Sequence, residues 1–139
     1  MTDRHMSDVM HNVRPVTLHG HDTVKAACAL MGEHKIGAVL ITDADGMLEG
    51  IFTGRDAVRL LAEGRSPAQM RLDEVMTRNP TTVAPGRTAF EALHTMHEGG
   101  FRHLPVTVDG TLLGIVSHGD FRAIEHAIFD EQTGLWERL

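Results

Sequence analysis

Cysteine, tyrosine and tryptophan are nearly missing from this sequence. Among its 139 residues there are one cysteine, one tryptophan and no tyrosine. The single cysteine, Cys28, excludes an intramolecular disulfide and any zinc site built from several cysteines. Cys28 lies in an apolar stretch typical of a helix face, so we expect a small buried hydrophobic residue rather than a reactive thiol. An aromatic content of 4% disfavours the base-stacking platforms of proteins that bind single-stranded nucleic acid.

Long apolar runs and an excess of positive charge are also missing. No run approaches the roughly 20 apolar residues that span a bilayer, and the first ten residues lack the apolar core of a secretory signal. We therefore expect a cytoplasmic protein with no membrane contact. A net charge of −6 argues against a broad basic surface that would bind nucleic acid. His94 and His97 are three residues apart, but no carboxylate pattern surrounds them, so we expect no metal site.

What the sequence does contain is an internal repeat. Residues 23–31 match residues 88–96, a shift of 65, and Asp56 matches Asp120, a shift of 64. The shift falls by one because the second copy is one residue shorter in the stretch between the two matches. The chain is therefore two copies of one unit.

The repeat sets the domain boundaries that we expect. The first copy covers residues 7–64 and the second covers residues 72–128, joined by a linker near residues 63–71 that contains Gly, Ser and Pro. A tail at residues 129–139 carries Trp136 among charged residues. The tail either packs on its own module or contacts a partner, because tryptophan is favoured at interface cores.

Each copy predicts the element order β-α-β-β-α. In the first copy the expected strands lie near residues 16–18, 38–41 and 48–52, and the expected helices cover residues 23–33 and 54–62. In the second copy the expected strands lie near residues 82–83, 104–106 and 112–116, and the expected helices cover residues 88–98 and 118–128.

Two local patterns support these elements. Asp45-Gly46 and Asp109-Gly110 are expected to supply the positive backbone angles of tight hairpin turns. Phe90, Leu93 and Met96 recur at helical spacing and are expected to form one apolar face. A unit of roughly 60 residues is marginal alone. We therefore expect an α+β fold in which the two repeats pack their sheets around a pseudo-twofold axis.

The ordered motifs resemble the cystathionine-β-synthase (CBS) repeat. The resemblance rests on RHLPV at residues 102–106, an Asp-Gly hairpin and GIVSHGD at residues 114–120, with KIGAVLITD and GIFTGRD in the first copy. It covers about residues 7–128. It implies a non-enzymatic regulatory pair of repeats, often a homodimer, that senses an adenosine-containing ligand such as AMP, ADP, ATP or S-adenosylmethionine. We expect any regulated partner to be a separate chain.

Two strand-to-helix junctions hold the expected binding residues. These residues are Thr53, Arg55 and Asp56 in the first copy and Ser117, His118 and Asp120 in the second. The first amides of a helix lack internal partners and favour a phosphate, and a hydroxyl or Arg55 can donate to it. A carboxylate can accept from both hydroxyls of a ribose, the role that the resemblance implies for Asp56 and Asp120. The alternative is a capping box that needs no ligand.

Arg102 and His103 are the other candidates. In similar modules polar residues at these positions face phosphates, and the alternative is a solvated strand entrance. The first copy has Gly37 and Ala38 there, without charge, so the two pockets are expected to be unequal. We expect the pocket at Asp120 to be completed by Gly37, Ala38, Val16 and Thr17, and the pocket at Asp56 by His103, Thr82 and Val83.

Three classes of function compete. A module that senses a nucleotide is favoured, and the alternative is a structural or protein-interaction module with degenerate pockets. No nucleophile, metal set or paired acid–base carboxylates indicate an enzyme. The closing helices carry more apolar surface than one small sheet face needs, so a twofold homodimer is expected. Those apolar residues are Val58, Leu60, Leu61, Phe121, Ile124 and Ile128.

Overall fold

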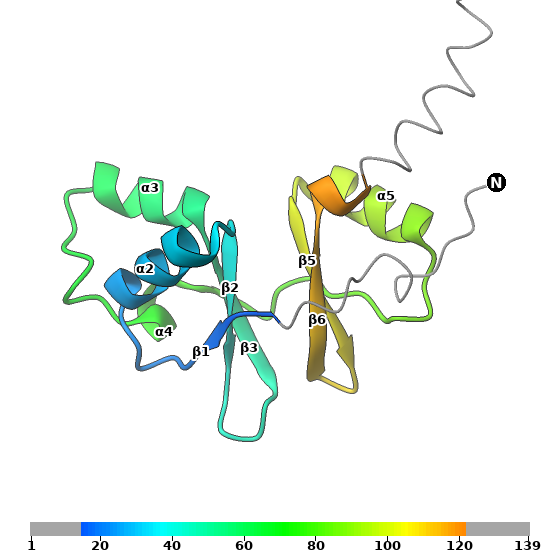
Figure 1. Ribbon diagram of the computed structural model, residues 1–139, viewed down its shortest axis with the longest axis horizontal. Coiled ribbons are helices and arrows are strands. Elements are labelled where there is room, and N and C mark those ends of the chain that lie inside the picture. Colours follow the sequence, from blue (N-terminus) through cyan, green and yellow to red (C-terminus); the bar gives the residue numbers. More distant parts are fainter. Residues whose placement is uncertain (1–14, 122–139) are drawn as a thin grey trace, which may run out of the picture.

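The computed structural model describes residues 15–121, in which two sheets face each other and the helices lie on their outer sides (Figure 1). The first sheet has the strand order β1-β2-β3-β4, and the second pairs β5 with β6. The strands are β1 Thr17–Leu18, β2 Ala38–Thr42, β3 Leu48–Thr53, β4 Thr77–Arg78, β5 His103–Val108 and β6 Thr111–Ser117. The helices are α2 Val24–His34, α3 Gly54–Ala62, α4 Leu72–Val75, α5 Ala89–Gly99 and the 3-10 helix η1 His118–Phe121. This confirms the predicted α+β fold of two β-α-β-β-α repeats, although the opening strand of the second repeat is only a bridge between Val83 and Val106.

Threonine caps fix where the helices that follow the opening strands begin. The Thr23 hydroxyl accepts from the amide of Ala26, and α2 begins at Val24, directly after Thr23. At α5, Thr88 and Glu91 form a reciprocal capping box. Both helices end on a left-handed residue, Lys35 after α2 and Gly100 after α5. The helical boundaries of the two copies are therefore set by equivalent residues.

The two hairpin turns differ. Asp109 and Gly110 have φ of 50° and 82°, and together they make the two-residue connection between β5 and β6. In the hairpin of the first repeat Gly46 has positive φ, at 81°, but Asp45 does not, so the prediction for Asp45 is wrong. The Asp43 carboxylate accepts there from the amides of Asp45 and Met47, and the extra residue makes a wider loop.

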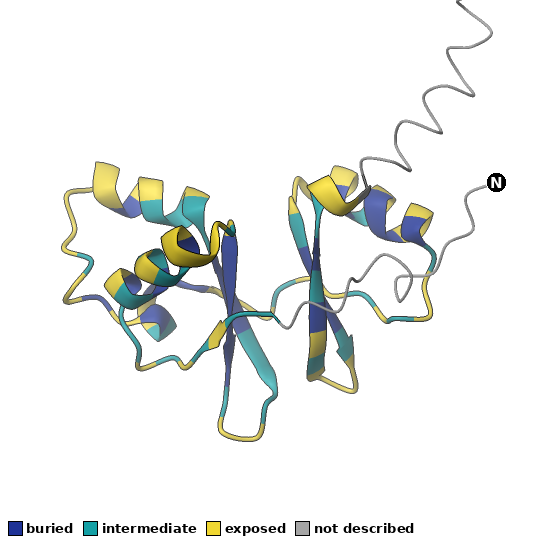
Figure 2. Cartoon of the chain, viewed as in Figure 1, coloured by how far each residue is buried: buried dark blue, intermediate teal, exposed yellow. Residues whose placement is uncertain are grey.

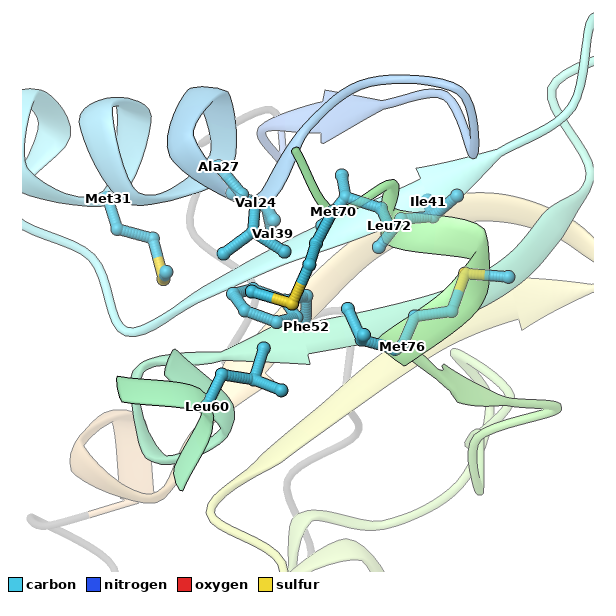
Figure 3. Packing of buried hydrophobic residues seen from close by; sticks show 11 residues of the cluster. Val24, Ala27, Met31, Val39, Ile41, Phe52, Leu60, Met70, Leu72 and Met76 are labelled. Carbon is cyan, nitrogen blue, oxygen red and sulfur yellow. The ribbon is translucent and has the colours of Figure 1, made fainter. Parts of the chain in front are cut away.

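Each sheet buries its outer face under its own helices (Figure 2). The core of the first repeat centres on Phe52, fully buried among residues of α2, α3, β2 and α4 (Figure 3). Cys28 is half-buried against this core, and burial raises the pKa of its thiol. The facing sides of the two sheets form a separate apolar cluster between the repeats, made of Ala38, Leu40, Leu48, Ile51, Leu112 and Ile115. Two units that are each marginal alone thus share one apolar seam.

The buried face of α5 differs from the predicted one. Leu93 and Met96 are buried as expected, but Phe90 is 52% exposed. The buried positions are Ala89, Ala92, Leu93 and Met96, spaced i, i+3, i+4 and i+7. A constant spacing of three drifts around the helix, so Phe90 falls beside the buried stripe.

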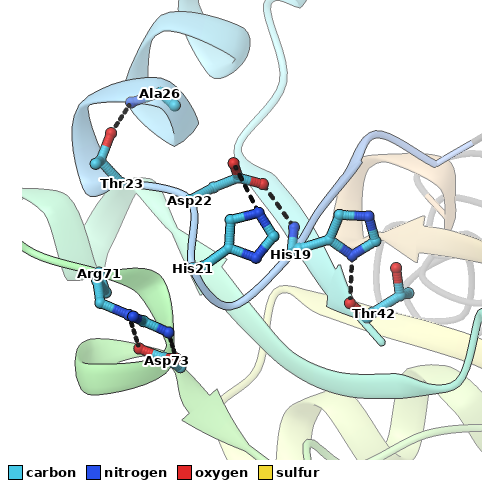
Figure 4. A network of polar contacts seen from close by, with 8 residues as sticks. All are labelled: His19, His21, Asp22, Thr23, Ala26, Thr42, Arg71 and Asp73. Atoms are coloured by element: carbon cyan, nitrogen blue, oxygen red, sulfur yellow. Dashed lines mark hydrogen bonds and ion pairs between the residues drawn. The ribbon is translucent and has the colours of Figure 1, made fainter. Parts of the chain in front are cut away.

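The linker between the repeats is more ordered than its composition suggests. The residues directly after it form α4 and β4, and the amides of Leu72 and Asp73 donate to the carbonyls of Asp22 and Gly20. Figure 4 shows the polar contacts around this junction. The side chain of Arg71 donates to Asp73 and lowers the pKa of that carboxyl.

The strand β4 lies very close to β3. A Cβ at Gly50 would lie 2.6 Å from the sulfur of Met76 and 2.8 Å from the carbonyl oxygen of Thr77. Glycine at this position therefore allows the start of the second copy to pair with the sheet of the first.

Candidate functional site

Two cavities lie where the repeats meet, and each is lined by residues of both repeats. The larger, the Asp56 pocket, has a volume of about 570 Å³. It is lined by Gly37, Ile51, residues 53–56, Thr77, residues 79–81 and residues 100–103. The smaller, the Asp120 pocket, has a volume of about 460 Å³. It is lined by Pro15, Val16, residues 34–38, His103, Ile115, Ser117 and Asp120.

The pockets are related by the internal repeat. Each contains the end of one central strand and the first turn of the helix that follows it, with the start of a strand from the other repeat opposite. The register supports the match, because Ala38 pairs with Thr53 and His103 pairs with Ser117. The predicted residues Thr53, Arg55, Asp56, Arg102 and His103 line the Asp56 pocket, and Val16, Gly37, Ala38, Ser117 and Asp120 line the Asp120 pocket.

The first junction is a complete capping box. The amide and the hydroxyl of Thr53 donate to Oδ2 of Asp56, at 2.9 and 3.0 Å, and the Asp56 amide donates back to the hydroxyl at 3.3 Å. The only proton of the Thr53 hydroxyl is therefore directed to Asp56. The other carboxylate oxygen, Oδ1, takes no part in the cap and lies 3.6 Å from the guanidinium of Arg59. A ligand at this junction would meet an acceptor oxygen that the cap leaves unused.

The second junction repeats the two bonds to the aspartate oxygen Oδ2. The amide and the hydroxyl of Ser117 donate to Oδ2 of Asp120, at 2.7 and 3.2 Å. The Asp120 side chain is exposed, whereas that of Asp56 is only 14% exposed. In both copies the first amide of the closing helix is also engaged, because Gly54 donates to the Gly37 carbonyl and His118 to the Arg102 carbonyl. In each repeat one carboxylate oxygen accepts the junction's hydrogen bonds and the other takes no part in them.

His103 and Gly37 form a wall common to both pockets. A Cβ at Gly37 would lie 3.1 Å from Nε2 of His103, so glycine gives the imidazole its space. Burial lowers the pKa of His103 and the positive charge of Arg102 lowers it further, against an opposing effect of Asp120. The lowered pKa favours the neutral form of the imidazole between the pockets.

Four predicted site residues line neither pocket. The amide of Val83 donates to the Pro105 carbonyl, and the Val83 side chain packs against the core of the second repeat under α5. Thr82 and Val83 therefore do not line the Asp56 pocket, and residues 79–81, just upstream, line it instead. Thr17 is exposed beside the lining residue Val16. The His118 ring lies edge-on to that of His97, with centroids 5.7 Å apart. The sequence predicts Thr17, Thr82 and Val83 on short strands, but it does not fix which side of a strand faces a cavity.

Several lining residues were missed from the sequence. The most informative are Lys35 and His34 in the Asp120 pocket and Asn79, Thr81 and Phe101 in the Asp56 pocket. The repeat itself carried the signal for two of them. Shifting Gly100 and Phe101 of the Asp56 pocket back by 65 residues gives Lys35 and Ile36 of the Asp120 pocket. The repeat therefore predicts that these two pairs occupy equivalent places.

Residues 15–121 contain no group of three or more histidine, cysteine, aspartate or glutamate side chains that could hold a metal ion. Within the same range, no helix is long and apolar enough to cross a membrane.

Comparison with known proteins gives the class of this architecture. The sequence pattern of the CBS domain matches residues 6–63 and again residues 72–126. The chain belongs to the CBS domain family and contains a pair of these domains.

Individual relatives agree with this assignment. The chain is 40% identical over 104 residues to the CBS domain-containing protein CBSCBSPB2 of Arabidopsis thaliana, which covers 74% of the chain but 19% of that protein. The chain thus spans about a fifth of the length of this plant relative. It is 33% identical to the CBS domain-containing protein YhcV of Bacillus subtilis, covering 75% of the chain and 74% of that protein. Among solved structures, the CBS domain pair of protein MJ0100, in complex with 5′-methylthioadenosine and S-adenosyl-L-methionine, matches with a TM-score of 0.80 and 25% identity. That match covers 88% of this chain and 96% of the other.

Proposed function

We propose that this CBS pair is a regulatory module that binds an adenosine-containing ligand between its repeats and modulates a separate protein. One observation carries the proposal: each inter-repeat pocket has an aspartate whose Oδ2 caps a helix while its Oδ1 is left over for a ligand. The MJ0100 pair supports it, because that similar structure contains two adenosine-containing molecules.

The pocket chemistry suits such a ligand. An aspartate oxygen accepts from ribose hydroxyls. Ile51 and Phe101 give the Asp56 pocket apolar surface for an adenine ring, while Arg55 and Arg102 carry positive charge to its rim. Because one ligand would contact both repeats, its binding would stabilise their packing across the seam. A change in that packing is how we propose the signal reaches a partner.

Catalysis is not part of the proposal. Asp56 and Asp120 occupy equivalent places in opposite pockets, and each has one oxygen engaged by a cap. They do not face one another as an acid and a base. The competing function is a structural module with pockets that bind nothing.

Ligand-dependent stability separates these two functions. A ligand that binds only the native state raises stability by RT ln(1 + [L]/Kd), about 2.7 kcal/mol at a hundredfold excess over Kd. We expect at least one of AMP, ADP, ATP and S-adenosylmethionine to raise the melting temperature in a thermal-shift assay, with inosine monophosphate as the control for the adenine ring. If none of the four shifts it at millimolar concentration, the structural function replaces the regulatory one.

We also propose a homodimer that uses α3. Val58 and Leu61 are 67% and 63% exposed on that helix, whereas Leu60 is only 3% exposed, contrary to the expectation that it adds to the outer surface. The side chains of Phe121, Ile124 and Ile128 lie outside the described residues. Two exposed aliphatic side chains one turn apart favour burial against a second copy.

Sedimentation tests the dimer directly. We expect wild-type protein at tens of micromolar to sediment as a dimer and the Val58→Glu/Leu61→Glu variant as a monomer. Leu113→Glu places a charge on another exposed leucine, 47% exposed on β6, and is expected to leave the dimer intact. A wild-type protein that is only monomeric would contradict the proposal.

A further inference from the structure

The two pockets differ at two symmetry-related positions, and the difference is the same at both. Arg55 precedes Asp56, and the residue preceding Asp120 is Gly119. Arg102 precedes His103, and the residue preceding Ala38 is Gly37. Strand pairing fixes this correspondence, because Ala38 and His103 pair with the residues that cap the two closing helices. Each arginine at the Asp56 pocket thus has a glycine as its counterpart at the other.

The charges that line the pockets follow from this. Arg55 and Arg102 line the Asp56 pocket together with one carboxylate, Asp56, which gives that lining a net charge of +1. The Asp120 pocket has Lys35 against Asp120, which leaves no net charge, with His34 as a further titratable group. His103 belongs to both pockets and adds charge to neither while its imidazole is neutral. Arg59 lies outside the lining and partly neutralises Asp56 at 3.6 Å, which raises the excess of positive charge around the first pocket.

Guanidinium groups suit phosphates in a way that one lysine does not. Arginine presents a planar fork of donors that binds phosphate oxygens in pairs, whereas lysine is a hydrated point charge on a flexible stem. Resting on the adenosine-binding function proposed above, we propose that the pockets take two classes of ligand. The Asp56 pocket binds an adenosine nucleotide with a phosphate chain, and the Asp120 pocket binds an adenosine compound without one.

The first test removes the guanidinium groups and compares ATP with adenosine by calorimetry. The Arg55→Gln/Arg102→Gln variant is expected to bind ATP at least about tenfold more weakly, since charged hydrogen bonds are lost, and to bind adenosine as the wild type does. Arg65→Gln removes an arginine of the linker that lines neither pocket, and is expected to change neither affinity. Tripolyphosphate, which has no ribose, is expected to bind far more weakly than ATP.

The second test adds an arginine to the other pocket. Gly119 tolerates a side chain, because its φ is not in the left-handed region and a Cβ there would meet only the Ser117 hydroxyl, at 3.9 Å. Gly37 is the less suitable position, because a Cβ there would lie 3.1 Å from Nε2 of His103 and the imidazole would have to shift. In an Asp56→Ala background, Gly119→Arg is expected to raise the ATP affinity of the remaining pocket by about tenfold. Gly119→Gln, of similar size and without charge, is the matched control and is expected to leave ATP affinity unchanged.

The outcomes separate this inference from the function on which it rests. If the wild type binds neither ATP nor adenosine, nor any of AMP, ADP and S-adenosylmethionine, both fail. If it binds both, but the double glutamine variant keeps its ATP affinity or loses adenosine equally, only the division of ligand classes is overturned. Tripolyphosphate binding as tightly as ATP would replace the nucleotide by a free polyphosphate. Equal gains from Gly119→Arg and Gly119→Gln would show that charge at this position does not select the ligand.

Discussion

Replacing Asp56 by alanine is expected to weaken ATP binding by at least about a hundredfold while lowering the free energy of unfolding by only about 1 kcal/mol. Hydrogen bonds to a charged group contribute about 1.5–3 kcal/mol each, and about 1.4 kcal/mol is tenfold in affinity. Two ribose hydroxyls bound to the carboxylate therefore account for the loss. The smaller cost in stability is that of a lost helix cap, since Oδ2 accepts from the Thr53 amide and hydroxyl.

The chain supplies its own control for the capping contribution. Glu91 forms with Thr88 the same reciprocal box at the start of α5, with bonds of 3.1 Å, and it lines neither pocket. Hydrogen bonds from Thr88 lower the pKa of Glu91, so the stability that this box contributes is present above the ordinary pKa of glutamate and is lost as the pH falls. Glu91→Ala is expected to lower the midpoint of urea denaturation at pH 7 and to leave ATP affinity unchanged.

A ribose analogue makes the comparison complete. 2′-Deoxy-ATP is expected to bind the wild type more weakly than ATP does, and to bind Asp56→Ala no more weakly than ATP does. The same cycle with adenosine and Asp120→Ala examines the second pocket, where loss of affinity is expected to exceed loss of stability. Should either alanine variant lose stability and still prefer the ribose ligand as the wild type does, that aspartate is a helix cap and nothing more.

The repeat is what made the fold readable from sequence. A shift of about 65 residues matched Thr23 with Thr88 and Asp56 with Asp120, and the structure places the matched threonines at the same helical caps. The prediction of tight turns from Asp-Gly pairs was correct for one hairpin and wrong for the other. Asp109-Gly110 has both angles positive, whereas Asp45 does not, because the Asp43 side chain satisfies two amides in the first loop and removes the need for a tight turn.

The residues that line the pockets could be predicted only in part, because the spacing of apolar residues does not show which side chains face a cavity. The aspartates and the Arg102-His103 pair could be found, because the repeat predicts the ends of the strands and these residues lie directly beside them. Residues 79–81 could not be distinguished from Thr82 and Val83, because only the pairing of Val83 with β5 shows which of them turns into the core. The wall shared by Gly37 and His103 depends on contact between the repeats, which no single repeat encodes.

Replacing Phe52 by alanine is expected to lower the free energy of unfolding by about 3–5 kcal/mol, the usual cost of emptying a buried aromatic site. Phe52 is fully buried on β3, directly before the capping residue Thr53, and it contacts a core drawn from helices on one side of the first sheet (Figure 3). Native domains are stable by only about 5–15 kcal/mol. The variant is therefore expected to unfold at a much lower urea concentration, measured by far-ultraviolet circular dichroism.

Phe90→Ala is the matched control, because it removes the same side chain from a helix position that is 52% exposed. Its expected cost is below about 1 kcal/mol, as for most surface substitutions. The pair also decides between two accounts of α5. If Phe90 lay on the buried face, as its spacing with Leu93 and Met96 first suggested, both variants would be destabilised by similar amounts. A large loss for Phe52→Ala with little change for Phe90→Ala places the buried stripe on Ala89, Ala92, Leu93 and Met96. It also shows that Phe52 holds in place the strand that ends at Thr53, from which the helix carrying Asp56 begins.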